Sequence, residues 1–318
     1  MRSRPPAAVA ASAILAPPSR RSVALDTAAI YGFEFTRPFD AGGFHFEPVS
    51  TNQQEIHGLA RDLERHHLTG TVSAPTLSRE ALFDLTAILS FIEHLDVRLS
   101  LPITMDDTPA LPERFFDLAL PAAHRNNGGG AVVGCDAFNP WKQSRHQFIE
   151  RALLAVTKRK SPRPSGPPLL LYKCVETFRQ RSPFVEITYF LLISALEAFC
   201  RAEQNDFETK SGVEPIVKTL RAYGFDVENN RPTRPERSMV NYFHLRNALF
   251  HEGRFTRTVN VDGMDRVLNC SDYLFHLSML VSLTVMKAVG FDDGQTNWDC
   301  WIDRQLWKPS PLRPLVAG

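Results

Sequence analysis

The chain lacks the sequence signatures of several large enzyme classes. It has no Gly-x-x-x-x-Gly-Lys-Ser/Thr loop, no Gly-x-Ser-x-Gly elbow, no His-Glu-x-x-His helix and no protein-kinase motif set. These absences exclude P-loop NTPases, hydrolases with that nucleophile elbow, zincin-type peptidases and protein kinases. The glycine run at residues 128–130 also lacks the spacing of a dinucleotide fingerprint, so we expect a flexible turn there.

Cysteine is scarce and scattered. The 318 residues contain five cysteines and no Cys-x-x-Cys pair, which excludes a disulfide framework and a zinc knuckle. Cys174, Cys200 and Cys270 lie within apolar helical patterns, where a free thiol packs as a small hydrophobic group. We therefore expect a reducing, cytoplasmic location, with no metal and no cofactor.

Neither a strong net charge nor a long apolar run is present. Because the formal net charge is +1, any contact with nucleic acid must come from local basic patches. The most apolar stretch, residues 274–289, carries His276, Thr284 and Lys287, and it is too short and too polar for a membrane span. We expect a buried helix there and no membrane partner.

Residues 1–27 have the composition of a low-complexity tail. Arg2 and Arg4 precede a run of small residues, which superficially resembles a secretory leader. The centre of that run is mostly alanine, and two prolines and two arginines follow it, so we expect a weakly structured tail rather than export.

Residues 28–140 predict a β-rich, mixed N-terminal domain. Residues 30–36 alternate in polarity, and residues 44–49, 69–73, 96–102 and 131–133 have further strand-like patterns. One clear helix is expected to begin at Ser78, because an apolar stripe at helical spacing follows this capping residue. His57, His66 and His67 lie in a polar segment and are expected on the solvated surface.

The pattern becomes helical after residue 140. Residues 141–167 predict a helix and a basic, proline-rich connector, and residues 168–291 predict an all-α helical bundle. Its helices are expected at residues 169–180, 184–203, 213–223, 235–252 and 264–289. In the C-terminal extension, residues 292–318, three tryptophans could cover an apolar surface or simply trail off. The expected fold class is α+β overall.

The most informative motif is Arg246-Asn247-Ala-Leu-Phe-His251, at the end of the helix expected to stop at Gly253. Asn247 and His251 are four positions apart and share a helix face, and the long side chain of Arg246 can reach the same side. An arginine offers a fixed fork of donors to a phosphate, and a histidine can transfer protons near neutral pH. This combination is suited to binding a phosphodiester and transferring protons at it without a metal ion.

Arg-Asn-x-x-x-His resembles the signature of HEPN domains, which are compact helical modules that include many metal-independent endoribonucleases. The helix at residues 189–200 contains the Ala-Leu-Glu segment, with Glu197, that is typical of the ApeA-like HEPN branch. The order of the helices fits as well, and the likeness covers residues 168–291 only.

The resemblance implies RNA cleavage by a homodimer in which two motif helices face each other. The ribose 2′-hydroxyl would attack the adjacent phosphate and leave a 2′,3′-cyclic phosphate. His251 would manage protons, Arg246 would bind phosphate, and Asn247 would orient His251 or the phosphate. Glu197 would pair with Arg246 or hold the motif helix. The resemblance also suggests prokaryotic anti-phage defence or stress physiology, with an N-terminal domain that responds to an unidentified trigger or partner.

Other interpretations of these residues stay open. Arg246 could be a surface ion-pair partner, His251 could merely cap helix carbonyls, and the module could be a catalytically silent one that dimerises or binds RNA or a partner. A small-ligand or nucleotide sensor is a third possibility. Arg237, Arg254 and Arg257 flank the motif and form either an RNA-binding rim or solvated surface. His244 and His251 are two helical turns apart, about 10 Å, which is too far for one metal ion.

Overall fold

The structure is a computed structural model of the chain, and it describes residues 25–62, 65–105, 115, 131–157, 166–179, 184–261 and 263–309. The expectations for most of the N-terminal tail, the glycine run at 128–130 and the basic connector at 158–165 lie outside the described residues. Helices and an antiparallel sheet are both present, which confirms the α+β class.

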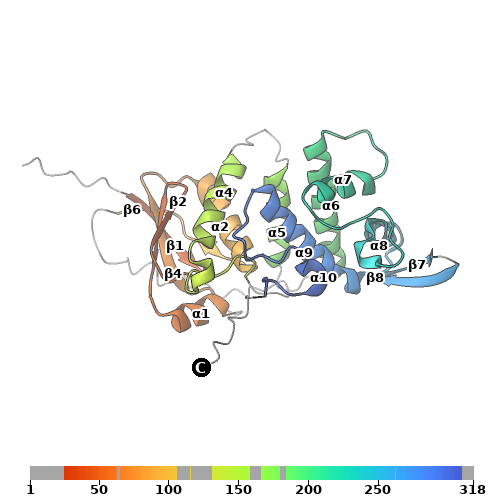
Figure 1. Cartoon of the computed structure of the whole chain (residues 1–318). Helices are drawn as coiled ribbons and strands as arrows, with labels where there is room; N and C mark the ends of the chain where they lie inside the picture. Colours follow the sequence, from red (N-terminus) through yellow and green to blue (C-terminus); the bar gives the residue numbers. More distant parts are fainter. Residues whose placement is uncertain are drawn as a thin grey trace, which may run out of the picture.

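An antiparallel sheet forms the first layer of the N-terminal half (Figure 1). Its strand order is β2-β3-β4-β1-β5, and β6 also pairs with β1. The strands are β1 (Leu25–Tyr31), β2 (Phe39–Ala41), β3 (Phe44–Pro48), β4 (Leu68–Ala74), β5 (Arg98–Leu99) and β6 (Ile103–Met105). Gly42 and Gly43 connect β2 to β3 with φ angles of 60° and 86°, which glycine adopts without strain. The strand expected at residues 131–133 is wrong, because Val132 and Val133 are buried in a loop.

Three helices accompany this sheet. They are α1 (Gln53–Arg61), α2 (Arg79–Glu93) and α4 (Ser144–Thr157). Ser78 caps α2 as expected, by accepting a hydrogen bond from the Ala81 amide. Helix α1 was not expected; Asn52 caps it, and only Ile56 and Ala60 are buried along it. Its apolar stripe was too narrow for the helical period to be recognised.

The C-terminal half contains most of the expected helices, with ends shifted by a few residues. They are α5 (Pro167–Arg179), α6 (Val185–Gln204), α7 (Val213–Ala222), α8 (Met239–Glu252) and α9 (Cys270–Ala288), followed by the short α10 (Cys300–Asp303). Two 3-10 turns, η1 (Asn139–Trp141) and η2 (Pro235–Arg237), precede α4 and α8. Helix α6 packs against α5, α7, α8 and α9 and is therefore the centre of this half.

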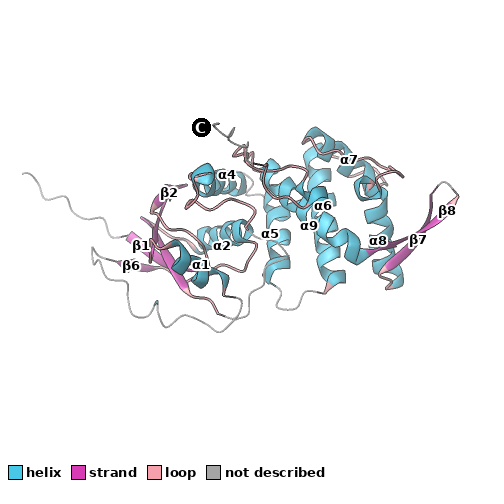
Figure 2. Ribbon diagram, turned by 60° about the horizontal axis from the view of Figure 1, so that its bottom comes forward, coloured by secondary structure: helices cyan, strands magenta, loops and turns pink. Residues whose placement is uncertain are grey.

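The expectation that this half is all-α is wrong. A β-hairpin, β7 (Thr256–Val261) and β8 (Met264–Asn269), lies between α8 and α9 and projects from the helices (Figures 1 and 2). Residues 264–269 were expected to begin the last helix, but they pair with β7 from Thr256↔Asn269 to Val261↔Met264. The Asn269 side chain accepts a hydrogen bond from the Ser271 amide, so α9 begins only after the hairpin.

One continuous hydrophobic core joins the two halves. Helix α2 packs against α4 and α5, and α4 also contacts β2, so these helices separate the sheet from the C-terminal bundle (Figure 2). Cys174, Cys200 and Cys270 are buried as free thiols, as expected. Within the described ranges, no helix has the length and apolar character needed to cross a bilayer.

Candidate functional site

Helix α8 carries the Arg-Asn-x-x-x-His motif on its last two turns. Gly253 ends the helix with a φ of 63°, and the Gly253 and Arg254 amides donate to the Leu249 and Ala248 carbonyls. Tyr242 and Leu245 are buried against the bundle. Because the buried side is occupied by these apolar groups, the helix presents motif side chains to solvent.

Arg246 is held by its neighbours on two sides. Its Nη1 donates to Asn247 Oδ1 at 3.0 Å, and its Nη2 lies 3.9 Å from Glu197 Oε2. The guanidinium carbon also lies 5.9 Å from the centre of the Phe243 ring. Within one chain, Asn247 therefore orients Arg246 rather than His251. The Arg246 side chain is still 32% exposed.

Glu197 lies between two guanidinium groups. Its Oε1 accepts from Arg201 Nε at 3.1 Å, while its Oε2 faces Arg246. The Glu197–Arg246 pairing that the resemblance implied is therefore present. Gly212 makes this arrangement possible, because a Cβ at that position would come within 2.7 Å of Glu197 Oε1. The carboxylate sets the position of Arg246 from the central helix α6.

His251 is exposed at the C-terminal end of α8. Its ring meets the Phe250 ring edge-on, with centroids 5.2 Å apart. Among the described residues, its imidazole makes no hydrogen bond or ion pair, and backbone amides rather than His251 satisfy the carbonyls at the helix end. His251 is thus accessible to a substrate, and the capping interpretation has no hydrogen bond to support it.

The three basic residues expected at an RNA-binding rim differ in their surroundings. Arg254 and Arg257 are exposed at 73% and 45%, and both approach Glu252, at 3.6 and 2.7 Å. Arg237 is buried, with ion pairs to Asp226 and Asp299 at 3.1 and 3.2 Å. The expectation that Arg237 contacts RNA is therefore wrong, because its guanidinium is enclosed and already paired.

An apolar groove lies beside Arg246, between α6 and α8. It has a volume of about 280 Å³, and Ile187, Phe190, Leu249 and Phe250 contribute to its walls. The Phe190 and Phe250 rings stack with their centroids 5.3 Å apart, yet they are 39% and 63% exposed. The sequence pattern did not reveal this groove, because apolar residues at helical spacing usually mark a core-facing side.

The N-terminal histidines also differ from expectation. His66 is buried and bonds through Nε2 to the Asp96 carbonyl at 2.7 Å, so its expected surface position is wrong. His57 is 60% exposed but bonds to the buried carboxylate of Glu34 at 3.0 Å. In the part of the chain that the structure describes, no three His, Cys, Asp or Glu side chains form a set that could hold a metal ion.

The chain matches no protein-family model, no curated protein and no solved structure. The HEPN resemblance therefore depends on the residues of the motif, the Ala-Leu-Glu helix and the order of the helices.

Proposed function

We propose that the chain is a metal-independent endoribonuclease whose site is built around Arg246, Asn247 and His251. The observation that carries this proposal is the fixed position of Arg246. Its guanidinium is oriented by Glu197 and Asn247 at the end of α8, with the exposed imidazole of His251 one turn further on. A partly exposed, pre-oriented guanidinium is suited to a phosphate, and an accessible imidazole is suited to proton transfer.

The chemistry is an internal transesterification. The ribose 2′-oxygen attacks the adjacent phosphorus and loses its proton to an imidazole, while the bond from phosphorus to the 5′-oxygen breaks. The leaving 5′-oxygen takes up a proton, and the other product ends in a 2′,3′-cyclic phosphate. Arg246 stabilises the charge that develops on the phosphate oxygens. This reaction transfers no hydride or electron, and it needs no metal ion.

A homodimer supplies the second half of the site in this proposal. The groove between α6 and α8 exposes Ile187, Phe190 and Phe250, with Arg246 at its edge. Large apolar side chains that gather on a surface favour association with another protein surface. A two-fold pairing through this groove would bring two motif helices together, so that one His251 accepts a proton and His251 of the partner subunit donates one.

Arg254 and Arg257 are suited to steer RNA toward this dimer. They lie where α8 leads into β7, and both side chains are substantially exposed. Their contribution is limited by Glu252, which neutralises part of their charge. The N-terminal half would sense the trigger, and the resemblance favours a role in prokaryotic defence or stress.

A catalytically silent HEPN module is the second candidate. The observation that favours it is the engagement of Arg246 by Glu197, because an ion pair between α6 and α8 also serves to hold the two helices together. In that case the groove would serve only to dimerise or to bind a partner. The two candidates differ in one measurable property, which is the cleavage of RNA.

The test compares RNA cleavage by the wild-type chain and by His251→Ala, on a mixed RNA pool with EDTA present. The expected result is cleavage by the wild type that leaves 2′,3′-cyclic phosphate ends, with a loss of at least a hundredfold in the variant. His45→Ala is the matched control, because His45 is a half-exposed histidine in strand β3, within the sheet. Equal cleavage by His251→Ala and the wild type, or cleavage that EDTA abolishes, would overturn the mechanism.

A further inference from the structure

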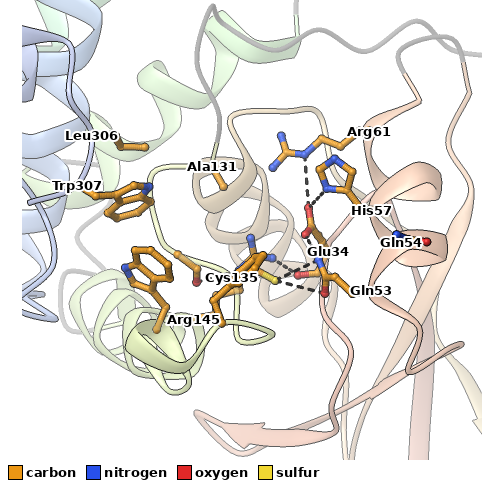
Figure 3. A pocket seen from close by; sticks show the side chains of 13 residues that line it. Glu34, Gln53, Gln54, His57, Arg61, Ala131, Cys135, Arg145, Leu306 and Trp307 are labelled. Carbon is orange, nitrogen blue, oxygen red and sulfur yellow. Dashed lines mark hydrogen bonds and ion pairs between the residues drawn. The ribbon is translucent and has the colours of Figure 1, made fainter. Parts of the chain in front are cut away.

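A second cavity lies between the N-terminal half and the C-terminal segment, and no motif residue lines it. It has a volume of about 470 Å³, which is within the usual range for a small-molecule site. Helix α1, the loop at residues 131–138, the start of α4 and the C-terminal segment near Trp307 enclose it (Figure 3). Polar groups form one wall and aromatic rings form the other.

Glu34 is the centre of the polar wall. Its Oε1 accepts from Gln53 Nε2 at 2.5 Å, and its Oε2 lies 3.0 Å from His57 Nδ1 and 3.6 Å from Arg61 Nε. Burial alone would raise the pKa of Glu34, but Arg145, His57 and Arg61 outweigh that effect and hold the pKa below its usual value. The group is therefore an ionised carboxylate at neutral pH. Each carboxylate oxygen has two lone pairs. Oε2 already faces His57 and Arg61, whereas Oε1 has Gln53 as its donor and keeps capacity for another.

A buried arginine supports this wall from behind. Arg145 is 2% exposed, and its Nη1 donates to the Glu34 carbonyl and to Glu93 Oε1. Its Nη2 has no hydrogen-bond partner among the described residues. Figure 3 shows Arg145 and Cys135 between the Trp307 side of the cavity and Glu34. A charge buried at this depth fixes the position of the surrounding carboxylates.

Trp141 and Trp307 form the aromatic wall. Their ring centroids are 5.0 Å apart with an angle of 52° between the planes, and Phe138 meets Trp141 edge-on. The close approach of Trp141 to the loop requires Gly134, since a Cβ there would overlap the indole ring. Trp307 is only half-buried, so part of its ring remains available for contact. Trp141 ends η1 in the middle of the chain and Trp307 lies near its C-terminal end, so the two rings meet only in the folded chain.

Covalent catalysis does not fit this cavity. Cys135 lines it, but burial raises the pKa of the Cys135 thiol to about 12. The sulfur is also within hydrogen-bond reach of Gln53 and Asp136. A protonated thiol is a poor nucleophile, so the cavity is suited to binding rather than to thiol chemistry.

We propose that this cavity binds a planar, amino-substituted heterocycle of the nucleobase type. The ring would stack on Trp307, and its exocyclic amino group would donate to Oε1 of Glu34. A volume of about 470 Å³ is large enough for such a ring, and aromatic stacking tolerates any base. Because Glu34 is an acceptor, it favours a ring with an exocyclic amino group over uracil, whose ring N–H lies between two carbonyl oxygens that repel a carboxylate. This inference does not depend on RNA cleavage, because it concerns a different set of residues.

The test is calorimetric titration of the full chain with guanosine, adenosine and cytidine, each of which carries an exocyclic amino group. Uridine, which has none, is the matched ligand control. We expect saturable binding of at least one amino-bearing nucleoside, at least tenfold tighter than that of uridine. Trp307→Leu should weaken this binding at least tenfold, and Trp298→Leu should leave it unchanged because Trp298 lies outside the cavity, beside Lys287.

Glu34→Gln adds a separate measurement of the polar wall. We expect it to weaken the binding of the amino-bearing nucleoside at least tenfold and to leave the affinity for uridine unchanged. Because Glu34 is buried, this variant could lose its fold, and Trp307→Leu then keeps the proposal testable through a half-buried residue. The proposal is overturned if no amino-bearing nucleoside binds at millimolar concentration. It is equally overturned if uridine binds as tightly, or if Trp307→Leu binds like the wild type.

Discussion

Arg237 and Asp299 join two segments that are far apart in the sequence. Arg237 Nη2 donates to Asp299 Oδ1 at 3.2 Å. Arg237 lies directly before helix α8, and Asp299 lies at the start of α10. The Arg237 guanidinium also lies over the ring of Trp301, at 5.5 Å. The C-terminal segment continues from there to Trp307, which lines the second cavity. One contact thus connects the segment that borders this cavity to the beginning of the motif helix.

The burial of Arg237 predicts a large loss of stability in Arg237→Ala. The substitution would remove the hydrogen bond to the Asp226 carbonyl and the ion pair to Asp299, and it would open a space beside Trp301. We expect the free energy of unfolding to fall by about 2 kcal/mol, measured by urea denaturation. Arg234→Ala, at an exposed position of the same segment, should change it by less than about 0.5 kcal/mol. Equal midpoints for the two variants would contradict the structural role of Arg237.

The position of Glu197 predicts a separation of activity from stability. Glu197→Gln keeps the shape of the side chain but removes the charge that attracts Arg246 and Arg201. We expect RNA cleavage to fall about tenfold, because the guanidinium is less firmly oriented, with a loss of stability of only about 1 kcal/mol. Glu203→Gln, at an exposed position of the same helix, is the control. If both variants cleave like the wild type, Glu197 does not position Arg246 for catalysis.

The exposed rings of the groove predict the oligomeric state. We expect the wild-type chain to be a dimer and Phe250→Ser to be a monomer, because the substitution removes the largest exposed apolar group of the groove. Light scattering coupled to size-exclusion chromatography measures the mass directly. Phe207→Ser, which changes a phenylalanine that is 68% exposed and outside the groove, should stay dimeric. A dimer that survives Phe250→Ser must form through another surface.

His94 predicts a specific dependence of stability on pH. It ends α2 with a φ of 52° and is buried, and desolvation, aided by Arg61, lowers its pKa from 6.5 to about 3. The unfolded chain therefore binds a proton below pH 6.5 that the folded chain does not. Above pH 6.5 both states leave His94 neutral, and the pH does not change its effect on stability. Below pH 6.5 the free energy of unfolding falls by about 1.4 kcal/mol per pH unit, until the pH reaches about 3.

Urea denaturation between pH 7.5 and 4.5 measures this dependence. His94→Asn removes the imidazole and keeps a residue that tolerates positive φ. We expect the variant to be less stable at pH 7.5. On acidification its free energy of unfolding should fall less steeply than that of the wild type, by a slope that corresponds to about one proton. An unchanged slope would show that His94 is protonated in the folded chain.

Local sequence predicted the elements whose hydrogen bonds lie within a few residues. Ser78 and Gly253 mark helix ends because capping and left-handed backbone depend on the residue itself. The spacing of Arg246, Asn247 and His251 on one helix was equally local. The sequence did not predict the hairpin after α8, because residues 264–269 contain enough apolar residues to begin the helix that follows. Only their pairing with residues 256–261 makes them a strand.

The sequence by itself therefore determined the α+β class, most helices of the C-terminal half and the spacing of the motif residues on one helix. Only the tertiary structure decided that Arg237 is buried, that Glu197 reaches Arg246, and that Glu34 and Trp307 enclose one cavity. The physical reason is the range of the interactions. Caps and helical periods act between near neighbours in the chain, whereas burial and ion pairing depend on segments that only folding brings together.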